Sequence, residues 1–135
     1  MTQEKYVKDA VALLTRLIAT PSTSRNEKEA ADIMEETIRE YGFLPQREVN
    51  NVWAIDPHYN PDKPTLLLNA HIDTVKPVDS WQRHPYAPTK EGDLLYGLGS
   101  NDCGGGLCSL LQIFRMLTEK PQSYNLIYLA SAEEE

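Results

Sequence analysis

Three short polar segments of the chain contain residue types that bind metal ions and transfer protons. They are His71–Asp73, Asn101–Asp102 and Glu133–Glu135. Imidazole is a common metal ligand, and a carboxylate beside it can hold the orientation of its ring. Adjacent carboxylates can divide two tasks, because one can bind a cation while the next accepts a proton from water. A metal-dependent hydrolytic site is therefore one hypothesis for these segments.

Each segment taken alone also has a simple structural explanation. His71 can be an ordinary core or surface histidine with Asp73 nearby by chance, and Asp102 can cap the helix that follows it. The three glutamates can form a solvated acidic end. The glycines after Asp102 suggest a phosphate loop, but the Lys-Ser/Thr pair of such loops is absent and a carboxylate there would repel phosphate. Only the three segments together favour a site.

Apolar runs before the three segments predict the strands that position them. The runs are "TLLLNA" at 65–70, "DLLYG" at 93–97 and "NLIYLA" at 125–130. The first and last are hydrophobic almost throughout, which is typical of strands that are covered on both faces. In open α/β sheets, ligands bind at the carboxyl ends of the strands. We therefore expect the polar segments to meet at one edge of a sheet.

The remaining elements predict an α/β fold. Apolar residues recur at helical spacing over 7–18, before Pro21, and again over 107–117. A Ser-x-x-Glu capping box at 24–27 and Gly42 predict the limits of another helix. Asn50 and Asn51 predict the turn of a hairpin. The order of the elements indicates one domain with a mixed sheet sandwiched by helices.

Composition restricts the classes of partner. A chain of 135 residues with 41% hydrophobic content can form about one compact domain. Its net charge of −7 opposes binding to nucleic acid or to an anionic membrane, and favours small-molecule or peptide substrates. No apolar run approaches the ~20 residues of a membrane span. The first residues do not read as a signal peptide, so we expect a cytoplasmic protein whose Cys103 and Cys108 are free thiols.

Three ordered motifs, "NAHIDTV", "YGLGSND" and "LASAEEE", resemble those of the M20 family of metallopeptidases and amidohydrolases. The separations also agree with that family, at 31 residues from His71 to Asp102 and 32 from Asp102 to Glu134. The resemblance extends over the whole chain. It implies a catalytic domain of the zinc-exopeptidase type.

The resemblance also implies a role for each site residue. His71 would bind a first metal ion, Glu135 a second, and Asp102 would bridge both. Glu134 would act as the general base and Asp73 would orient the imidazole. Zinc is the expected metal, with cobalt as a substitute, and the two ions would activate a water molecule for attack on an amide.

Further consequences of the resemblance concern the backbone and the ligand count. A cis peptide is expected between Asp102 and Cys103, and Glu133 aligns with a non-catalytic acid. Each metal ion is one ligand short of the usual three. The family supplies a further Glu and a His beyond residue 135, together with a lid or dimerisation domain. We therefore expect 1–135 to be the N-terminal portion of a catalytic domain and to be inactive alone. The resemblance also implies a homodimer for the full-length form.

The substrate is predicted only as a class. "HIDTV" followed by "DSWQRHPYAPT" is most similar to the acetylornithine deacetylase and succinyl-diaminopimelate desuccinylase branch, and we favour the deacetylase, an enzyme of arginine biosynthesis. The alternatives are a desuccinylase or a di- or carboxypeptidase. Many relatives have Lys-Gly-Gly shortly after the bridging Asp, whereas this chain has three glycines. A different class, a non-catalytic α/β binding module, also stays open.

Overall fold

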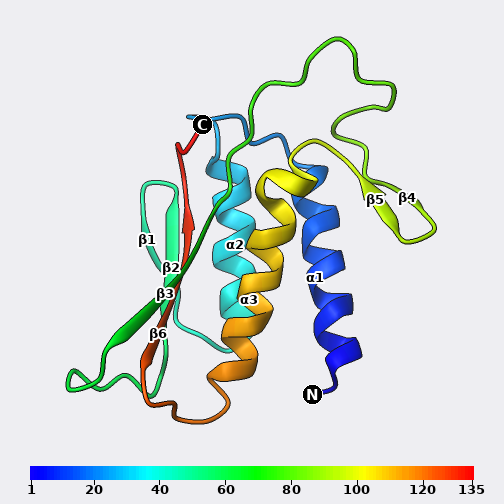
Figure 1. Ribbon diagram of the computed structural model, residues 1–135. Coiled ribbons are helices and arrows are strands. Elements are labelled where there is room, and N and C mark those ends of the chain that lie inside the picture. Colours follow the sequence, from blue (N-terminus) through cyan, green and yellow to red (C-terminus); the bar gives the residue numbers. More distant parts are fainter.

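The computed structural model describes residues 1–135 (Figure 1). The elements follow in the order α1 (Gln3–Ile18), α2 (Lys28–Glu40), β1 (Gln46–Glu48), β2 (Asn51–Ile55), β3 (Thr65–His71), β4 (Thr89–Glu91), β5 (Leu94–Tyr96), a π-helical turn η1 (Ser100–Gly104), α3 (Gly105–Leu117) and β6 (Asn125–Ser131). The α/β class predicted from the sequence is confirmed. No helix combines the length and the apolar character that crossing a membrane requires.

The main sheet is mixed and has the strand order β1-β2-β6-β3. The last strand of the chain, β6, lies inside the sheet, antiparallel to β2 and parallel to β3. The two parallel strands are in register along their whole length, from Thr65 opposite Asn125 to His71 opposite Ser131. Their carboxyl ends therefore meet at the same edge of the sheet. A separate two-stranded ribbon is formed by β4 and β5.

The three α-helices lie on one face of this sheet and enclose the core (Figure 1). Each helix has an apolar stripe that faces inward, as the helical spacing of the sequence predicts. Burial of each large core side chain contributes about 1.5–3 kcal/mol. The largest fully buried apolar side chains are Met34, Ile38, Leu107, Leu111, Phe114, Leu126 and Tyr128.

The opposite face of the sheet has no helix on it. The prediction that residues 65–70 are covered on both faces is wrong for these residues, since Leu66 is 45% and Leu67 52% exposed. The physical reason is that α1, α2 and α3 share one face and that β3 is an edge strand, with β6 as its only neighbour (Figure 1). On the open face, Trp53, Leu67 and Leu129 border a shallow hollow of about 370 Å³.

The β1–β2 hairpin forms as predicted, but its turn lies one residue earlier than expected. Glu48 pairs with Asn51, so Val49 and Asn50 form the loop. Val49 takes the left-handed backbone conformation, with φ of 55°, that the sequence argument assigned to asparagine. Asn51 instead starts β2, and its side-chain oxygen accepts a hydrogen bond from the Ala132 N–H at 2.8 Å. The turn prediction considered only neighbouring residues and so could not include this contact with a residue 81 positions away.

The capping box predicted at 24–27 does not form. Helix α2 begins at Lys28, and the residue before it, Glu27, makes no side-chain hydrogen bond to the first turn of the helix. Its carboxylate instead accepts a hydrogen bond from the N–H of Glu133 at 2.6 Å. A tertiary contact therefore takes the place of the local one.

Candidate metal centre

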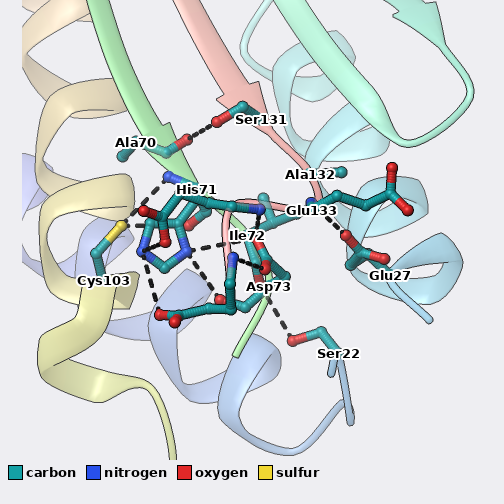
Figure 2. A network of polar contacts seen from close by, with 12 residues as sticks. Ser22, Glu27, Ala70, His71, Ile72, Asp73, Cys103, Ser131, Ala132 and Glu133 are labelled. Atoms are coloured by element: carbon teal, nitrogen blue, oxygen red, sulfur yellow. Dashed lines mark hydrogen bonds and ion pairs between the residues drawn. The ribbon is translucent and has the colours of Figure 1, made fainter. Parts of the chain in front are cut away.

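The three polar segments meet where the strands end. His71 closes β3, Asp102 lies in η1 just before α3, and Glu134 and Glu135 follow β6. Because β3 and β6 are parallel neighbours, the polar residues that follow them emerge at one edge of the sheet (Figure 2). The prediction that the segments meet at one edge of a sheet is confirmed for His71 and the glutamates. It is wrong for the strand before Asp102, because β5 pairs only with β4 in the separate ribbon, and Asp102 reaches the site from the turn η1.

The side chains approach one another closely around the imidazole of His71. Its Nε2 atom lies 2.9 Å from Asp102 Oδ1, 3.6 Å from Glu134 Oε2 and 3.9 Å from Glu135 Oε1. One ligand atom from each of His71, Asp102 and Glu135 lies within 4.8 Å of the other two. These three residues are the ligand set implied by the family resemblance. Their individual roles stay predictions.

The side chain of Asp102 is free to serve such a site. The N-cap position of α3 is occupied by Gly104, and no side chain caps that helix. The Asp102 carboxylate is 72% exposed and points to the imidazole of His71. The alternative in which Asp102 is a helix cap is therefore wrong. The Asp102–Cys103 peptide is cis, as the resemblance implied.

The orientation of the His71 ring is fixed through its other nitrogen. Nδ1 lies 2.8 Å from the backbone carbonyl oxygen of Asp73 and 3.4 Å from its Oδ1. An N–H at Nδ1 donates to that carbonyl, so Nε2 is the nitrogen that faces the carboxylates. Nε2 donates to Asp102 when it is protonated and offers its lone pair to a cation when it is not. Burial lowers the pKa of His71, but the hydrogen bonds to Asp102 and to the Asp73 carbonyl and the charges of Asp73 and Glu134 outweigh burial and raise it.

The carboxylate of Asp73 has a second set of contacts that the sequence did not indicate. It is buried, at 1% exposure, and accepts the backbone N–H of Glu134 at 3.1 Å through Oδ1 and that of Glu135 at 2.8 Å through Oδ2. Hydrogen bonds from backbone amides to a carboxylate are among the stronger ones in proteins. Asp73 therefore holds the backbone of the third motif as well as lying beside His71.

Cys103 ties the π-helical turn to the end of β3. Its Sγ atom accepts from the His71 N–H at 3.2 Å and donates to the His71 carbonyl oxygen at 3.3 Å (Figure 2). The two bonds fix η1 against the residue that carries the imidazole. Sequence reasoning missed this contact, for which the only available signal was the adjacency of Cys103 to Asp102. Neither Cys103 nor Cys108 forms a disulfide, as expected.

The electrostatics of the site fit a divalent cation. The carboxylates of Asp102, Glu134 and Glu135 pair with no lysine or arginine, and their only ion-pair partner is His71. Burial, a hydrogen bond with Asp102 and the charges of Asp102 and Glu134 raise the pKa of Glu135. A bound cation would relieve this repulsion. Imidazole nitrogen together with carboxylate oxygen is a donor set that zinc accepts.

Comparisons with known proteins agree with this geometry. The sequence profile of Peptidase family M20/M25/M40 matches residues 67–135, which contain all three motifs. The succinyl-diaminopimelate desuccinylase of Blochmanniella floridana is 30% identical over 96% of this chain and 36% of its own length. The enzyme of the same name from Coxiella burnetii (strain Dugway 5J108-111) is 28% identical over 94% of this chain and 35% of its own length.

Solved structures show the same fold. The M20 family metallo-carboxypeptidase Sso-CP2 from Sulfolobus solfataricus superposes with a TM-score of 0.73 at 28% identity, over 99% of this chain and 31% of that one. The dipeptidase Dug1p from Saccharomyces cerevisiae superposes with a TM-score of 0.71 at 18% identity, over 97% of this chain and 33% of that one, and shows the fold alone. The chain spans about a third of the length of these proteins. It belongs to Peptidase family M20/M25/M40.

Proposed function

We propose that the protein is a metal-dependent amidohydrolase that removes an N-acyl group from an amino acid. The observation that supports this proposal most directly is the convergence of His71, Asp102 and Glu135, with Glu134 beside them and no basic side chain to neutralise the acids. His71, Asp102 and Glu135 would hold the metal, with zinc as the first candidate and cobalt as a substitute. Bound divalent ions polarise an acyl carbonyl and make water more acidic.

Within this proposal, Glu134 moves the proton. Its carboxylate is 57% exposed and lies 3.6 Å from His71 Nε2, so it can reach a water molecule that shares the site with substrate. As general base it accepts the proton of the attacking water. As general acid it then returns that proton to the nitrogen of the departing amine. Its backbone is held by Asp73, which keeps the carboxylate in place through both steps.

Two acyl groups are the leading candidates for the substrate. The succinyl-diaminopimelate desuccinylases among the relatives support a succinyl group on diaminopimelate. The form of the HIDTV motif and the segment after it supports an acetyl group on ornithine. The relatives provide the broader support, because the similarity covers 96% of the chain. We therefore rank the succinyl substrate first, in place of the deacetylase favoured by the motif alone.

We further propose that residues 1–135 are the N-terminal portion of one catalytic domain. Proteins similar to the chain are about three times as long, since the match covers 36% of the relative from Blochmanniella floridana. A further Glu and a further His from other residues would then complete the coordination of both ions. By this proposal the isolated chain binds metal but does not turn over substrate.

The test is hydrolysis of N-succinyl-diaminopimelate and of N-acetylornithine, followed as release of amine, with zinc added to the full-length protein and to residues 1–135. We expect turnover only in the full-length protein. Glu134→Gln should lower kcat by about 10²–10⁴-fold while zinc content stays unchanged, because a general base contributes roughly that factor. Glu40→Gln, on the exposed end of α2, is the control. Turnover by the isolated chain, or full activity of Glu134→Gln, would refute the proposal.

A further inference from the structure

Glu27 is a buried acid that the proposed chemistry does not use. It is 0% exposed, although glutamate is rarely fully buried without a partner. Its partner is neither lysine nor arginine but a single backbone group, the N–H of Glu133, at 2.6 Å from Oε2 (Figure 2). The other oxygen, Oε1, has no hydrogen-bond partner. A buried carboxylate with one unpaired oxygen contributes little to stability, so its presence calls for another explanation.

The bond from Glu27 is one of three that hold consecutive backbone amides. The N–H groups of Glu133, Glu134 and Glu135 donate to Glu27 Oε2, Asp73 Oδ1 and Asp73 Oδ2, respectively. The backbone before the proposed base is therefore bound by Glu27, and the backbone at and after the base is bound by Asp73. Both carboxylates come from segments far away in the sequence.

The backbone at Glu133 needs such a restraint. Its φ of 57° lies in the left-handed region, which costs a non-glycine residue roughly 1–2 kcal/mol. The side chain does not stabilise this conformation, because it is exposed and only reaches Arg25 at 3.8 Å, itself 86% exposed. The hydrogen bond to Glu27 is therefore the buried contact that restrains the backbone of Glu133, and this backbone determines the direction of the Glu134 side chain.

The segment that carries Glu27 is itself attached to the end of β3. Ser22 Oγ donates to the Ile72 carbonyl at 3.1 Å, and the Thr74 N–H donates to the Ser22 carbonyl at 2.9 Å. The Ser24 N–H donates to the Thr74 carbonyl at 3.1 Å. These bonds fix the loop between α1 and α2 to the same stretch that carries His71 and Asp73. Glu27 thus acts from a rigid support.

We propose that Glu27 is a positioning residue for the general base, acting through the backbone of Glu133. The inference rests on the proposed function. Glu27 accepts the Glu133 N–H, holds the left-handed turn and so fixes the direction in which the Glu134 carboxylate leaves the chain. Metal binding depends less on Glu27, because the backbone of the ligand Glu135 has its own bond to Asp73.

The test compares Glu27→Gln with Glu29→Gln in the zinc-loaded full-length protein. Both variants remove one negative charge near the start of α2, but Glu29 is exposed. For Glu27→Gln we expect kcat to fall about ten- to hundredfold, since small misplacement of a catalytic group has effects of that size. KM and zinc content should stay within about threefold of the wild type. Glu29→Gln should behave as the wild type in all three.

A second measurement is independent of activity. In the metal-free protein, NMR should show a downfield amide proton for Glu133, because it donates to a carboxylate, and this signal should move upfield in Glu27→Gln only. If the wild type turns over and Glu27→Gln has the same kcat, or if the Glu133 amide signal is the same in both proteins, the positioning role alone is overturned. A wild type that binds zinc and hydrolyses neither substrate would overturn the proposed function instead.

Discussion

Two clusters of charged side chains, one at the strand ends and one between α1 and α3, are built on different principles. At the strand ends, Asp102, Glu134 and Glu135 crowd around one imidazole and have no basic partner. Between α1 and α3, Asp9 lies between two cations, with Lys5 Nζ at 2.7 Å and Arg115 Nη1 at 2.8 Å. The three acids of this strand-end cluster have no basic partner, whereas Asp9, the single acid of the cluster between the helices, has two; we call the latter the paired cluster.

The paired cluster also satisfies its remaining polar atoms. The Arg115 guanidinium donates to Gln112 Oε1 at 2.7 Å and stacks 3.5 Å from the centre of the Tyr41 ring. Gln112 in turn donates to the Tyr41 hydroxyl at 3.1 Å. Networks of this kind fix one packing arrangement of the helices. The difference indicates that the paired cluster serves stability, whereas the strand-end cluster is left without a basic partner, as the proposed metal site requires.

The largest effect that can test this comparison is on metal affinity. Asp102→Ala should weaken zinc binding by about a hundred- to a thousandfold, because a ligand is a substantial share of the free energy of a zinc site. The metal-free variant should keep its free energy of unfolding within about 0.5 kcal/mol or gain, because a repelled charge is removed. Zinc calorimetry and denaturant unfolding measure the two quantities.

The matched control for that experiment is Asp79→Ala, in the exposed loop before β4. It should change neither quantity. Zinc at a hundred times the wild-type Kd should also stabilise the wild type by about 2.7 kcal/mol and Asp102→Ala by no more than about 0.4 kcal/mol. If the metal-free Asp102→Ala variant lost stability and kept its zinc affinity, the strand-end cluster would serve stability and not metal binding.

The paired cluster should show the opposite behaviour. Arg115→Met leaves Asp9 with Lys5 alone and removes the stacking on Tyr41, so we expect a loss of about 2–3 kcal/mol in the free energy of unfolding. Zinc affinity should not change. Arg16→Met is the control, since the pair of Arg16 with Glu36 is exposed and 3.5 Å long and should contribute less than about 0.5 kcal/mol. Equal effects of the two variants would refute a special role for Arg115.

The sequence predicted the residues of the strand-end cluster much better than the contacts that hold their backbone in place. The resemblance of the three motifs to those of the M20 family implied His71, Asp102 and Glu135 as ligands, and the parallel pairing of β3 with β6 brings His71 and Glu135 to the same edge of the sheet. The partner of Glu27 could not be predicted in the same way. Ser24 and Glu27 fit a local capping box, and only the folded chain shows that the carboxylate reaches residue 133.

The layers of the fold show the same limit. Hydrophobic runs correctly predicted that β3 and β6 are strands, and β6 is an inner strand as expected. A run of leucines does not indicate which residues will cover it, however. Leu67 is exposed because the three α-helices pack on the other face of the sheet. Periodicity determines the type of an element, whereas coverage depends on contacts between elements.

The smallest expected effect is the pH dependence of the paired cluster. Burial raises the pKa of Asp9, but hydrogen bonds from Lys5 and Arg115 and their charges outweigh burial and hold that pKa below its usual value of 3.8. A carboxyl whose pKa is lowered by folding contributes stability above its unfolded pKa and loses it as the pH falls through the folded pKa. The wild type should therefore exceed Asp9→Asn in free energy of unfolding at pH 7, by less than the effect of Arg115→Met.

The difference in free energy of unfolding between the wild type and Asp9→Asn should stay constant down to about pH 5. It should shrink below the unfolded pKa of an aspartate, about 3.9. Unfolding of both proteins in urea between pH 2 and pH 7 measures it. Subtracting the variant is necessary because folding also lowers the pKa of Asp32, through hydrogen bonds from Arg47 and Lys28. A difference that grows as the pH falls would mean that Asp9 is held protonated, and the two clusters would then not differ in the way described.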